Sequence, residues 1–376
     1  MIEQIWLFTL AVFFVAVNGL TTLSYAASLG FALKPTAFAY FVGVIGNLLT
    51  GSVTPISAQA ATLTFSGFLK NINQRTGALI IGAVGMVLLG MFGGVTAITA
   101  FVGQPVIFGM MAGVGLMLAG VSLDMLKQNP RTGAISFVAG LFMWAWTRDL
   151  VYVVASAVTL SSLDFIFIQK KRVDIQAIAL ANGQNVDNIQ SDDHRFWTKA
   201  FWEEFKVLKP RFDLTAIFYA LGFMCIAIGT NIAFGNVTAG IAGTTQNPDH
   251  LTMISGLADI ASALFGGAPI AAIISGTAAA PWPVAAGIAM MLLVGILLFL
   301  GLMTRIAKYV PAQSIAGFLF VIGFFSTFLT NVNNAFATGY NAQVAFAMGV
   351  TALTKNPFFG LLAGLAIRQF GFVFGL

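Results

Sequence analysis

Apolar segments recur along nearly the whole chain of 376 residues, and this recurrence most constrains what the chain can fold into. Hydrophobic residues make up 58% of the sequence and charged residues 8%, whereas a soluble domain carries about 25% charged residues. Because a helix needs about 20 apolar residues to cross a bilayer, the pattern predicts an all-α polytopic membrane protein in contact with lipid. Basic loops then explain the formal charge of +5, and no nucleic-acid partner is expected.

We expect about 14 apolar segments, at 4–33, 37–51, 56–69, 75–94, 104–124, 132–147, 149–168, 213–236, 250–265, 269–281, 283–303, 311–330, 340–354 and 357–375. Residues 1–168 would form a first group of seven, 169–212 a polar linker and 213–376 a second group of seven. In the linker, FWTKAFWEEFKVL (196–208) predicts an amphipathic helix at the membrane interface. The third and tenth segments are too short to span and begin at Pro55 and Pro269, so they are predicted to be half-helices.

The two groups of seven resemble each other in sequence. VTPISAQAATLTFSG (53–67) aligns with GAPIAAIISGTAAAP (267–281), which places Pro55 on Pro269 and Ile56 on Ile270. IFGMMAGVG (107–115) aligns with IAGFLFVIG (315–323), and FTLAVFFVAV (8–17) resembles FYALGFMCIAI (218–228). Because seven is odd, the second copy must cross the bilayer in the opposite sense, which is the inverted repeat typical of secondary transporters.

Small residues and prolines inside apolar segments predict a solute pocket where the broken third and tenth segments meet. Irregular backbone at membrane depth is tolerated where it lines a cavity, and converging half-helix N-termini present free N–H groups there. The candidate binding residues in these segments are Ser57, Ala58, Gln59, Ile274, Ser275, Gly276 and Thr277. The alternative is a small-residue packing surface, in which Gln59 bonds a neighbouring helix and the hydroxyl groups bond their own helix.

Asp259 is an acid inside an apolar segment, and it is the candidate ion-coupling residue. A carboxylate at that depth costs about 2.5–3.5 kcal/mol on insertion scales, so a functional reason is expected. The coupling ion would be H⁺ or Na⁺, with no other cofactor. The alternative is a structural acid that caps the backbone of the broken helix.

Three stretches resemble the nucleobase/ascorbate transporter family, and its guanine/hypoxanthine branch in particular. They are LADIASALFGGAPIAAIISGTAAA (257–280), GALIIGAVGMVLLGMFGG (77–94) and QPVIFGMMAGVGLMLAGVSL (104–123). The resemblance implies a core domain of segments one to four and eight to eleven, and a gate domain of the other six. It also implies ion-coupled uptake of a purine or uracil-like base by alternating access, often as a homodimer.

The chain departs from that family at two positions. The stretch IAIGTNIAFGN (226–236) offers Thr230, Asn231 and Asn236 where the family carries an acid, and Ser275 stands where the family carries a glutamate. Thr230 and Asn231 complete the predicted substrate-binding set, although neither can titrate. The missing acids favour an alternative in which the same fold carries another small solute, such as an inorganic or organic anion. A channel or a non-transporting membrane scaffold is a third hypothesis.

Other function classes fit the sequence less well. No nucleophile–base pair or metal cluster stands at membrane depth, so neither an enzyme nor a metal site is expected. Apart from Arg148 and Arg368, every Lys and Arg follows an odd-numbered segment, which predicts that this side, with the linker 169–212, is cytoplasmic at the inner (plasma) membrane. Arg148–Asp149 and Asp249–His250 are expected in surface turns on the other side.

Overall fold

The computed structural model describes residues 2–67, 69, 71–169, 199–203, 205–303 and 309–370. These residues are mostly helical. The first half contains α1 (Ile2–Ser28), α2 (Leu33–Thr50), β1 (Ile56–Ala58), α3 (Ala60–Gly67), α4 (Ile72–Met91), α5 (Gly94–Val102), α6 (Gln104–Gln128), α7 (Pro130–Thr147), α8 (Leu150–Leu163) and η1 (Asp164–Ile168). The second half follows α10 (Lys199–Glu203) and contains α11 (Leu214–Ile241), α12 (Pro248–Ala263), β2 (Ile270–Ala272), η3 (Gly276–Ala279), α13 (Pro283–Phe299), η4 (Ala312–Ile315), α15 (Ala316–Phe320), η5 (Val321–Phe328), α16 (Leu329–Phe336), α17 (Asn341–Thr354) and α18 (Pro357–Phe370).

Each of the 14 expected segments coincides with one element or with a run of consecutive elements in the described chain. Among the described residues, five helical stretches are long and apolar enough to cross a membrane: Ile72–Met91, Gln104–Gln128, Leu150–Ile168, Leu214–Ile241 and Ala312–Phe336. The prediction of an all-α polytopic membrane protein is confirmed. The sequence missed α5, because residues 94–102 continue the apolar run of α4 and only Phe92 and the left-handed Gly93 separate the two helices.

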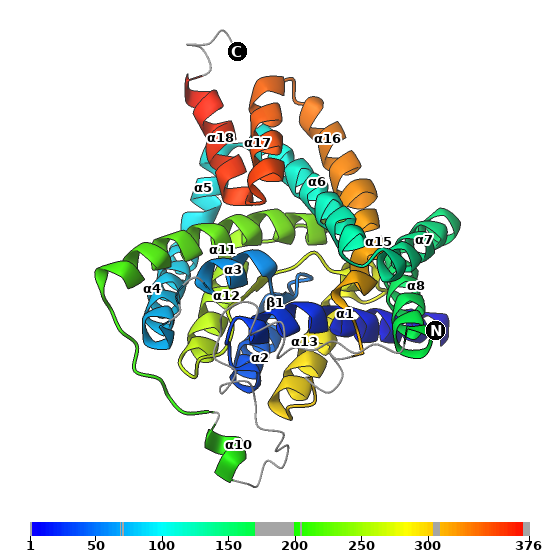
Figure 1. Ribbon diagram of the computed structural model, residues 1–376. Coiled ribbons are helices and arrows are strands. Elements are labelled where there is room, and N and C mark those ends of the chain that lie inside the picture. The colour runs from blue at the N-terminus through cyan, green and yellow to red at the C-terminus, as the bar shows by residue number, and fades with distance from the viewer. Residues whose placement is uncertain are drawn as a thin grey trace.

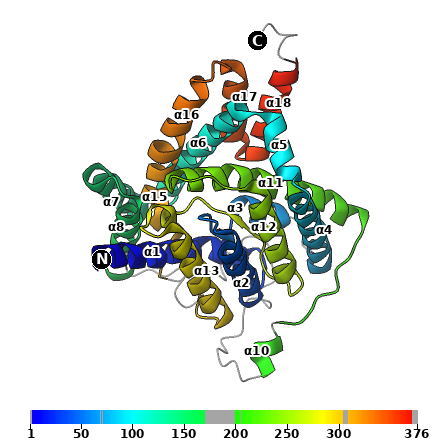
Figure 2. The same cartoon turned by 180° about the vertical axis from the view of Figure 1, so that it is seen from behind.

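The elements form two groups, which Figures 1 and 2 show from opposite sides. The core consists of α1–α4 and α11–α13 with both strands and η3, and the gate consists of α6–α8 and α15–α18 with the π-helical and 3-10 turns between them. Within the core, α4 packs on α12 and α2 packs on α13; within the gate, α6 packs on α17 and η5. Helix α11 runs along the boundary and touches α18 and α6.

Contacts within the gate reproduce the repeat inferred from the sequence. The alignment places Gly317 208 positions after Gly109, and Val344 lies the same 208 positions after Ser136. A Cβ added at Gly109 would lie 2.7 Å from the carbonyl oxygen of Val344, and one added at Gly317 would collide with the carbonyl oxygen of Ser136. One close approach is therefore the image of the other, as an internal two-fold relationship requires.

Two pairs of aligned residues meet each other directly. Gly115 and Gly323 face each other across α6 and η5, and a Cβ on Gly115 would lie 2.6 Å from the Gly323 carbonyl oxygen. In the core, the alignment of Ile56 with Ile270 makes Ala271 the equivalent of Ser57, and these two residues are register partners in the strand pair. A residue that contacts its own repeat equivalent lies on the pseudo-two-fold axis, so the axis passes through both domains.

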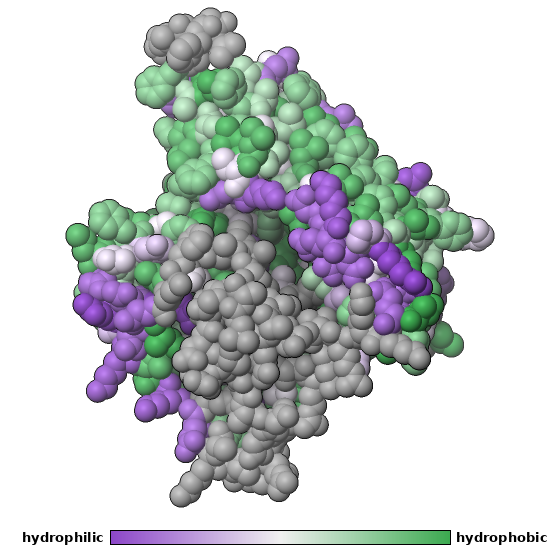
Figure 3. Space-filling view, viewed as in Figure 1, coloured by the Kyte–Doolittle hydropathy of each residue, from purple (hydrophilic) through white to green (hydrophobic). Residues whose placement is uncertain are grey.

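The surface is apolar where a lipid-facing bundle should be apolar. Figure 3 shows mostly hydrophobic surface over the gate helices α16, α17 and α18. Phe336, Phe346, Leu353 and Phe359 are among the exposed large side chains of these helices. Exposed apolar side chains in this arrangement match a multi-pass membrane protein surrounded by acyl chains.

Asp249 does not lie in a solvated turn, as the sequence suggested. Its side chain is buried, and Oδ1 accepts hydrogen bonds from the backbone N–H of Val95 at 2.8 Å and of Thr96 at 3.2 Å. The carboxylate thus caps the N-terminus of α5, where a helix has unpaired N–H groups. This contact ties α12 to α5, a helix that the sequence did not predict.

Part of the predicted amphipathic linker helix lies outside the described residues, which omit 170–198. Within the described part, α10 carries a buried Phe201 and an exposed Trp202. The Phe201 ring lies 4.8 Å from the Nζ atom of the buried Lys34, which is a cation–π distance. The linker is therefore attached to the start of α2 in the core.

Candidate functional site

The broken third and tenth segments meet as a pair of antiparallel strands in the middle of the core. Ile56 pairs with Ala272, Ser57 with Ala271 and Ala58 with Ile270, and all six residues are buried. The prediction that half-helices begin at Pro55 and Pro269 is wrong. Backbone polar groups at membrane depth need partners, and strand pairing supplies them before any helix starts.

The helical parts of these two segments are unequal. Helix α3 has eight residues, but the tenth segment has only the four-residue 3-10 turn η3. A single turn carries little macrodipole. The expected pair of opposing helix dipoles is therefore reduced to one.

Two predicted residues of the third segment use their side chains to hold the crossing together. The hydroxyl groups of Ser57 and Tyr40 are 2.6 Å apart, and the Tyr40 hydroxyl also accepts a bond from the N–H of Ala58 at 3.4 Å. The Gln59 amide donates to the backbone carbonyl of Ala272 on the other strand. These contacts fix β1 against α2 and β2.

Asn231 connects three elements of the core. Its Oδ1 atom accepts from the N–H of Ala272 at 2.9 Å and from the Ser255 hydroxyl at 3.4 Å, and the residue is fully buried in α11. Thr230 is buried beside it and donates to the carbonyl oxygen of Ala227 in its own helix. Asn231 therefore supports β2 from behind, whereas Thr230 bonds within α11.

The four predicted residues of the tenth segment lie at the start of η3. The hydroxyl groups of Ser275 and Thr277 are 2.7 Å apart, and Ser275 caps the turn by accepting from the Thr277 N–H. Gly276 is buried where core and gate meet: an added Cβ would lie 3.4 Å from Val15 of α1 in the core and 3.8 Å from Val154 of α8 in the gate. Ile274 is partly buried just before the turn.

Asp259 lies in α12, directly behind the second strand. Its Oδ1 atom accepts from the backbone N–H of Ile270 at 2.7 Å. Its Oδ2 atom is buried and has no hydrogen-bond partner among the described residues. One oxygen is thus committed to the backbone of the broken segment, and the other is left for a proton or a cation.

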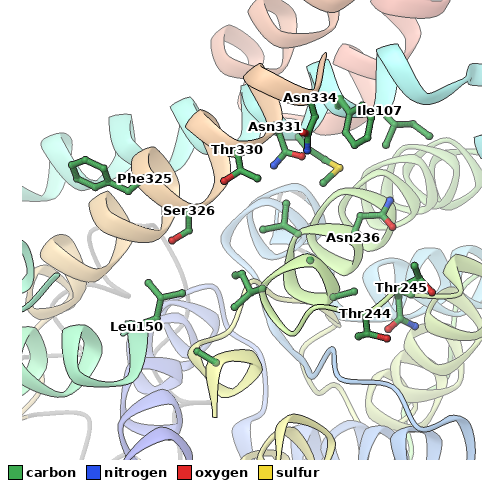
Figure 4. Close-up of a pocket in the computed structure, with 18 of the residues that line it drawn as sticks. Ile107, Leu150, Asn236, Thr244, Thr245, Phe325, Ser326, Thr330, Asn331 and Asn334 are labelled. Carbon is green, nitrogen blue, oxygen red and sulfur yellow. The ribbon is translucent and has the colours of Figure 1, made fainter. Parts of the chain in front are cut away.

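A cavity of about 1000 Å³, the interdomain cavity, lies between core and gate. The core contributes the second half of α11, the turn at 244–248 and Ala279 of η3; the gate contributes the start of α6, the α7–α8 connection, η5 and α16. Figure 4 shows Ser326, Thr330 and Asn331 opposite Asn236 across this space. The rim is exposed and polar, and residues such as Ile107 and Val237 close the bottom.

None of the predicted substrate-binding residues lines the interdomain cavity. They lie behind its wall, and Ala279 of η3 is the part of the tenth segment that reaches it. Their direct contact with a solute stays a prediction. Asn331 and Asn334 were not among the predicted residues, because they lie beyond the predicted end of the twelfth segment, in a helix that continues past residue 330. The π-helical stretch η5 before them becomes evident only in the structure, and π-helices often mark functional sites.

The α7–α8 connection places two charged residues on the cavity. Arg148 is exposed and has a left-handed backbone with φ of 56°. Its guanidinium lies 5.5 Å from the centre of the Trp144 ring. Asp149 caps α8 by accepting from the N–H of Val151 at 2.8 Å, and partial burial raises the pKa of this carboxyl. The expected surface turn is present, but it also forms part of the cavity wall.

Comparisons with known proteins find similarity in structure only. No protein-family model and no curated protein matches the sequence. The transmembrane domain of a cyanobacterium bicarbonate transporter, BicA, matches with a TM-score of 0.52 and 14% identity, over 95% of this chain and 97% of that one. The murine anion transporter Slc26a9 in its inward-facing state matches with a TM-score of 0.57 and 12% identity, over 100% of this chain and 69% of that one. The chain has the fold of these membrane transporters, which are not enzymes.

The expected membership of the nucleobase/ascorbate transporter family is therefore wrong, and so is the predicted nucleobase substrate. The structural neighbours are anion transporters. The motif at 257–280 misled the prediction because small residues around a broken segment are required by the fold, whatever solute it carries. An acidic residue would be needed to select a base. Position 275 is a serine, and the stretch 226–236 contains no Asp or Glu.

Proposed function

We propose that this protein is a secondary transporter that moves a small anion across the membrane. The observation that supports this most is the similarity in fold to the transmembrane domain of a bicarbonate transporter over 95% of the chain. The chemistry of the crossing agrees, because β1, β2 and residues 226–236 carry no carboxylate that would repel an anion. The polar side chains of these segments are instead the hydroxyl and amide groups of Ser57, Thr230, Asn231 and Asn236.

The mechanism would be alternating access by movement of the core against the gate. The rim of the interdomain cavity is formed by Gln104, Arg148–Asp149 and the turn at 244–246, which all follow even-numbered segments. In a bundle of spanning segments these connections lie on the face opposite the linker. We propose that the linker is cytoplasmic at the inner membrane, that the cavity is open to the outside, and that the protein forms a homodimer.

Uptake into proteoliposomes tests the proposed function. We expect the purified protein to accumulate at least one of labelled bicarbonate, sulfate and chloride above the level in protein-free liposomes. Uracil and guanine serve as uncharged comparison solutes, and no uptake of either is expected. Uptake of a base together with no uptake of any anion would contradict the proposal.

Asp259 is proposed to couple transport to H⁺ or Na⁺ through its unpartnered Oδ2 atom. The variant Asp259→Asn keeps an oxygen that can accept from the Ile270 N–H, so the strand pair should be retained. We expect this variant to lose accumulation driven by an ion gradient and to equilibrate the anion at a measurable rate. The measurement is uptake with and without inward Na⁺ and H⁺ gradients. Gradient-driven accumulation equal to wild type would exclude Asp259 from coupling.

A further inference from the structure

We propose that Arg148 recruits the transported anion into the interdomain cavity and selects a small oxyanion, such as bicarbonate, sulfate or a carboxylate. This inference rests on the proposed function and names the ligand class of the cavity. Arg148 is the only Lys or Arg among the residues that line the cavity in the described part of the chain. An anion that approaches from that face therefore meets one fixed positive charge at the rim.

The position of this charge is unusual for the sequence as a whole. Arg148 and Arg368 are the two basic residues that do not follow an odd-numbered segment. Arg368 has a structural task, because its guanidinium donates to the carbonyl oxygen of Val102 at 2.8 Å and so binds the end of α5. For Arg148, no side-chain hydrogen bond or ion pair occurs among the described residues. Its charge is left available to a ligand.

The backbone at Arg148 does not favour an arginine. The residue ends α7 in a left-handed conformation, and its N–H bonds to the carbonyl oxygen of Trp144 at 3.1 Å. Glycine is the residue that suits this helix-ending position, because it has no Cβ to clash. A strained backbone that carries a charged side chain at the rim of a cavity is typical of a functional residue.

The neighbouring carboxylate does not neutralise Arg148. Asp149 accepts the Val151 N–H at 2.8 Å as the cap of α8, and no ion pair joins it to Arg148. The two charges therefore act on a ligand separately and in opposite directions. This arrangement provides a matched pair of variants, since asparagine caps a helix about as well as aspartate and removes the charge.

The donors around Arg148 suit an oxyanion better than a halide. A guanidinium offers two parallel N–H bonds that match two oxygens of a planar or tetrahedral anion. The guanidinium of Arg148 lies over the Trp144 ring. The indole nitrogen of that ring is buried and has no hydrogen-bond partner in the described structure. Asn331 and Asn334 add amide groups to the same cavity from α16. A single halide ion has one acceptor atom, so the two N–H bonds of the fork must converge on it and do not run in parallel.

The test compares Arg148→Gly, Arg148→Lys and Asp149→Asn with wild type, using sodium bicarbonate, sodium sulfate and sodium chloride at constant ionic strength balanced with gluconate. Apparent affinity is measured by ligand-induced thermal stabilisation in detergent and by concentration-dependent uptake. Loss of a charge-assisted contact should weaken oxyanion binding about fivefold in Arg148→Gly, with unliganded stability at least equal to wild type. Asp149→Asn should strengthen binding of the same anions by about twofold.

The variants separate the parts of the proposal. Unchanged oxyanion affinity in Arg148→Gly would overturn the role of Arg148. Arg148→Lys keeps the charge without the fork, so it should bind chloride as wild type does and lose preference for bicarbonate and sulfate. An unaltered preference in Arg148→Lys would overturn the assignment to oxyanions. If wild type binds these anions through Arg148 without moving them across the membrane, the proposed function fails and the binding site stands.

Discussion

Replacing Gly115 with alanine is expected to destabilise the gate strongly, whereas Gly120→Ala in the same helix should be tolerated. A Cβ at position 115 would lie 2.5 Å from the backbone nitrogen of Phe328 and 2.6 Å from the carbonyl oxygen of Gly323. Both are main-chain atoms, so α6 and η5 would have to separate, at a cost of about 3 kcal/mol. A Cβ at Gly120 meets nothing within 4 Å, and alanine is the better helix former there.

Thermal denaturation in detergent, read together with monodispersity on gel filtration, measures this difference. Gly323→Ala should destabilise the protein to a similar degree, because a Cβ at position 323 would lie 2.8 Å from the Gly115 carbonyl oxygen, on the other side of the axis. The double variant should cost less than the sum of the two, since the first substitution already separates the helices. Equal stability of Gly115→Ala and Gly120→Ala would mean that α6 and η5 do not cross at this point.

The architecture was predictable because it follows from patterns that the bilayer imposes on the sequence. Apolar runs of spanning length give the segments, and Gly109, Gly115, Gly317 and Gly323 are repeated because the same close approaches occur twice. The meeting of the two broken segments in the core was also predictable from the aligned prolines. The strands themselves were not, because pairing depends on a partner about 214 positions away, and no local propensity reports it.

The site was predicted less well than the fold, for a physical reason. Ser57, Gln59 and Asn231 were selected as polar residues at membrane depth, and the structure shows that each bonds the backbone or side chain of another core element. A polar side chain in an apolar segment forms hydrogen bonds either with a solute or with a neighbouring strand, and the sequence alone does not distinguish these partners. Arg148 was overlooked for the opposite reason: a charged residue in a short connection looks like an ordinary surface turn.

Replacing Gly276 with leucine is expected to stop transport without unfolding the protein. Gly276 begins η3 in the core and faces Val154 of α8 and Phe318 of α15, both in the gate, at 3.8 Å from an added Cβ. Alanine therefore makes only ordinary contacts. The longer leucine side chain would reach between the domains and resist the sliding that alternating access requires, because packed interfaces have few arrangements and little free volume.

The kinetic pattern separates this blocking effect from the predicted contact between Gly276 and the solute. If the leucine obstructs domain movement, the maximal rate of anion uptake falls by about tenfold or more while anion affinity and thermal stability stay near wild type. Gly276→Ala should then transport almost normally, which controls for the loss of glycine itself. If affinity is lost instead and the maximal rate is kept, position 276 lines the solute site. Normal uptake by Gly276→Leu would show that η3 does not lie against a moving surface, so the boundary between core and gate would have to be drawn elsewhere.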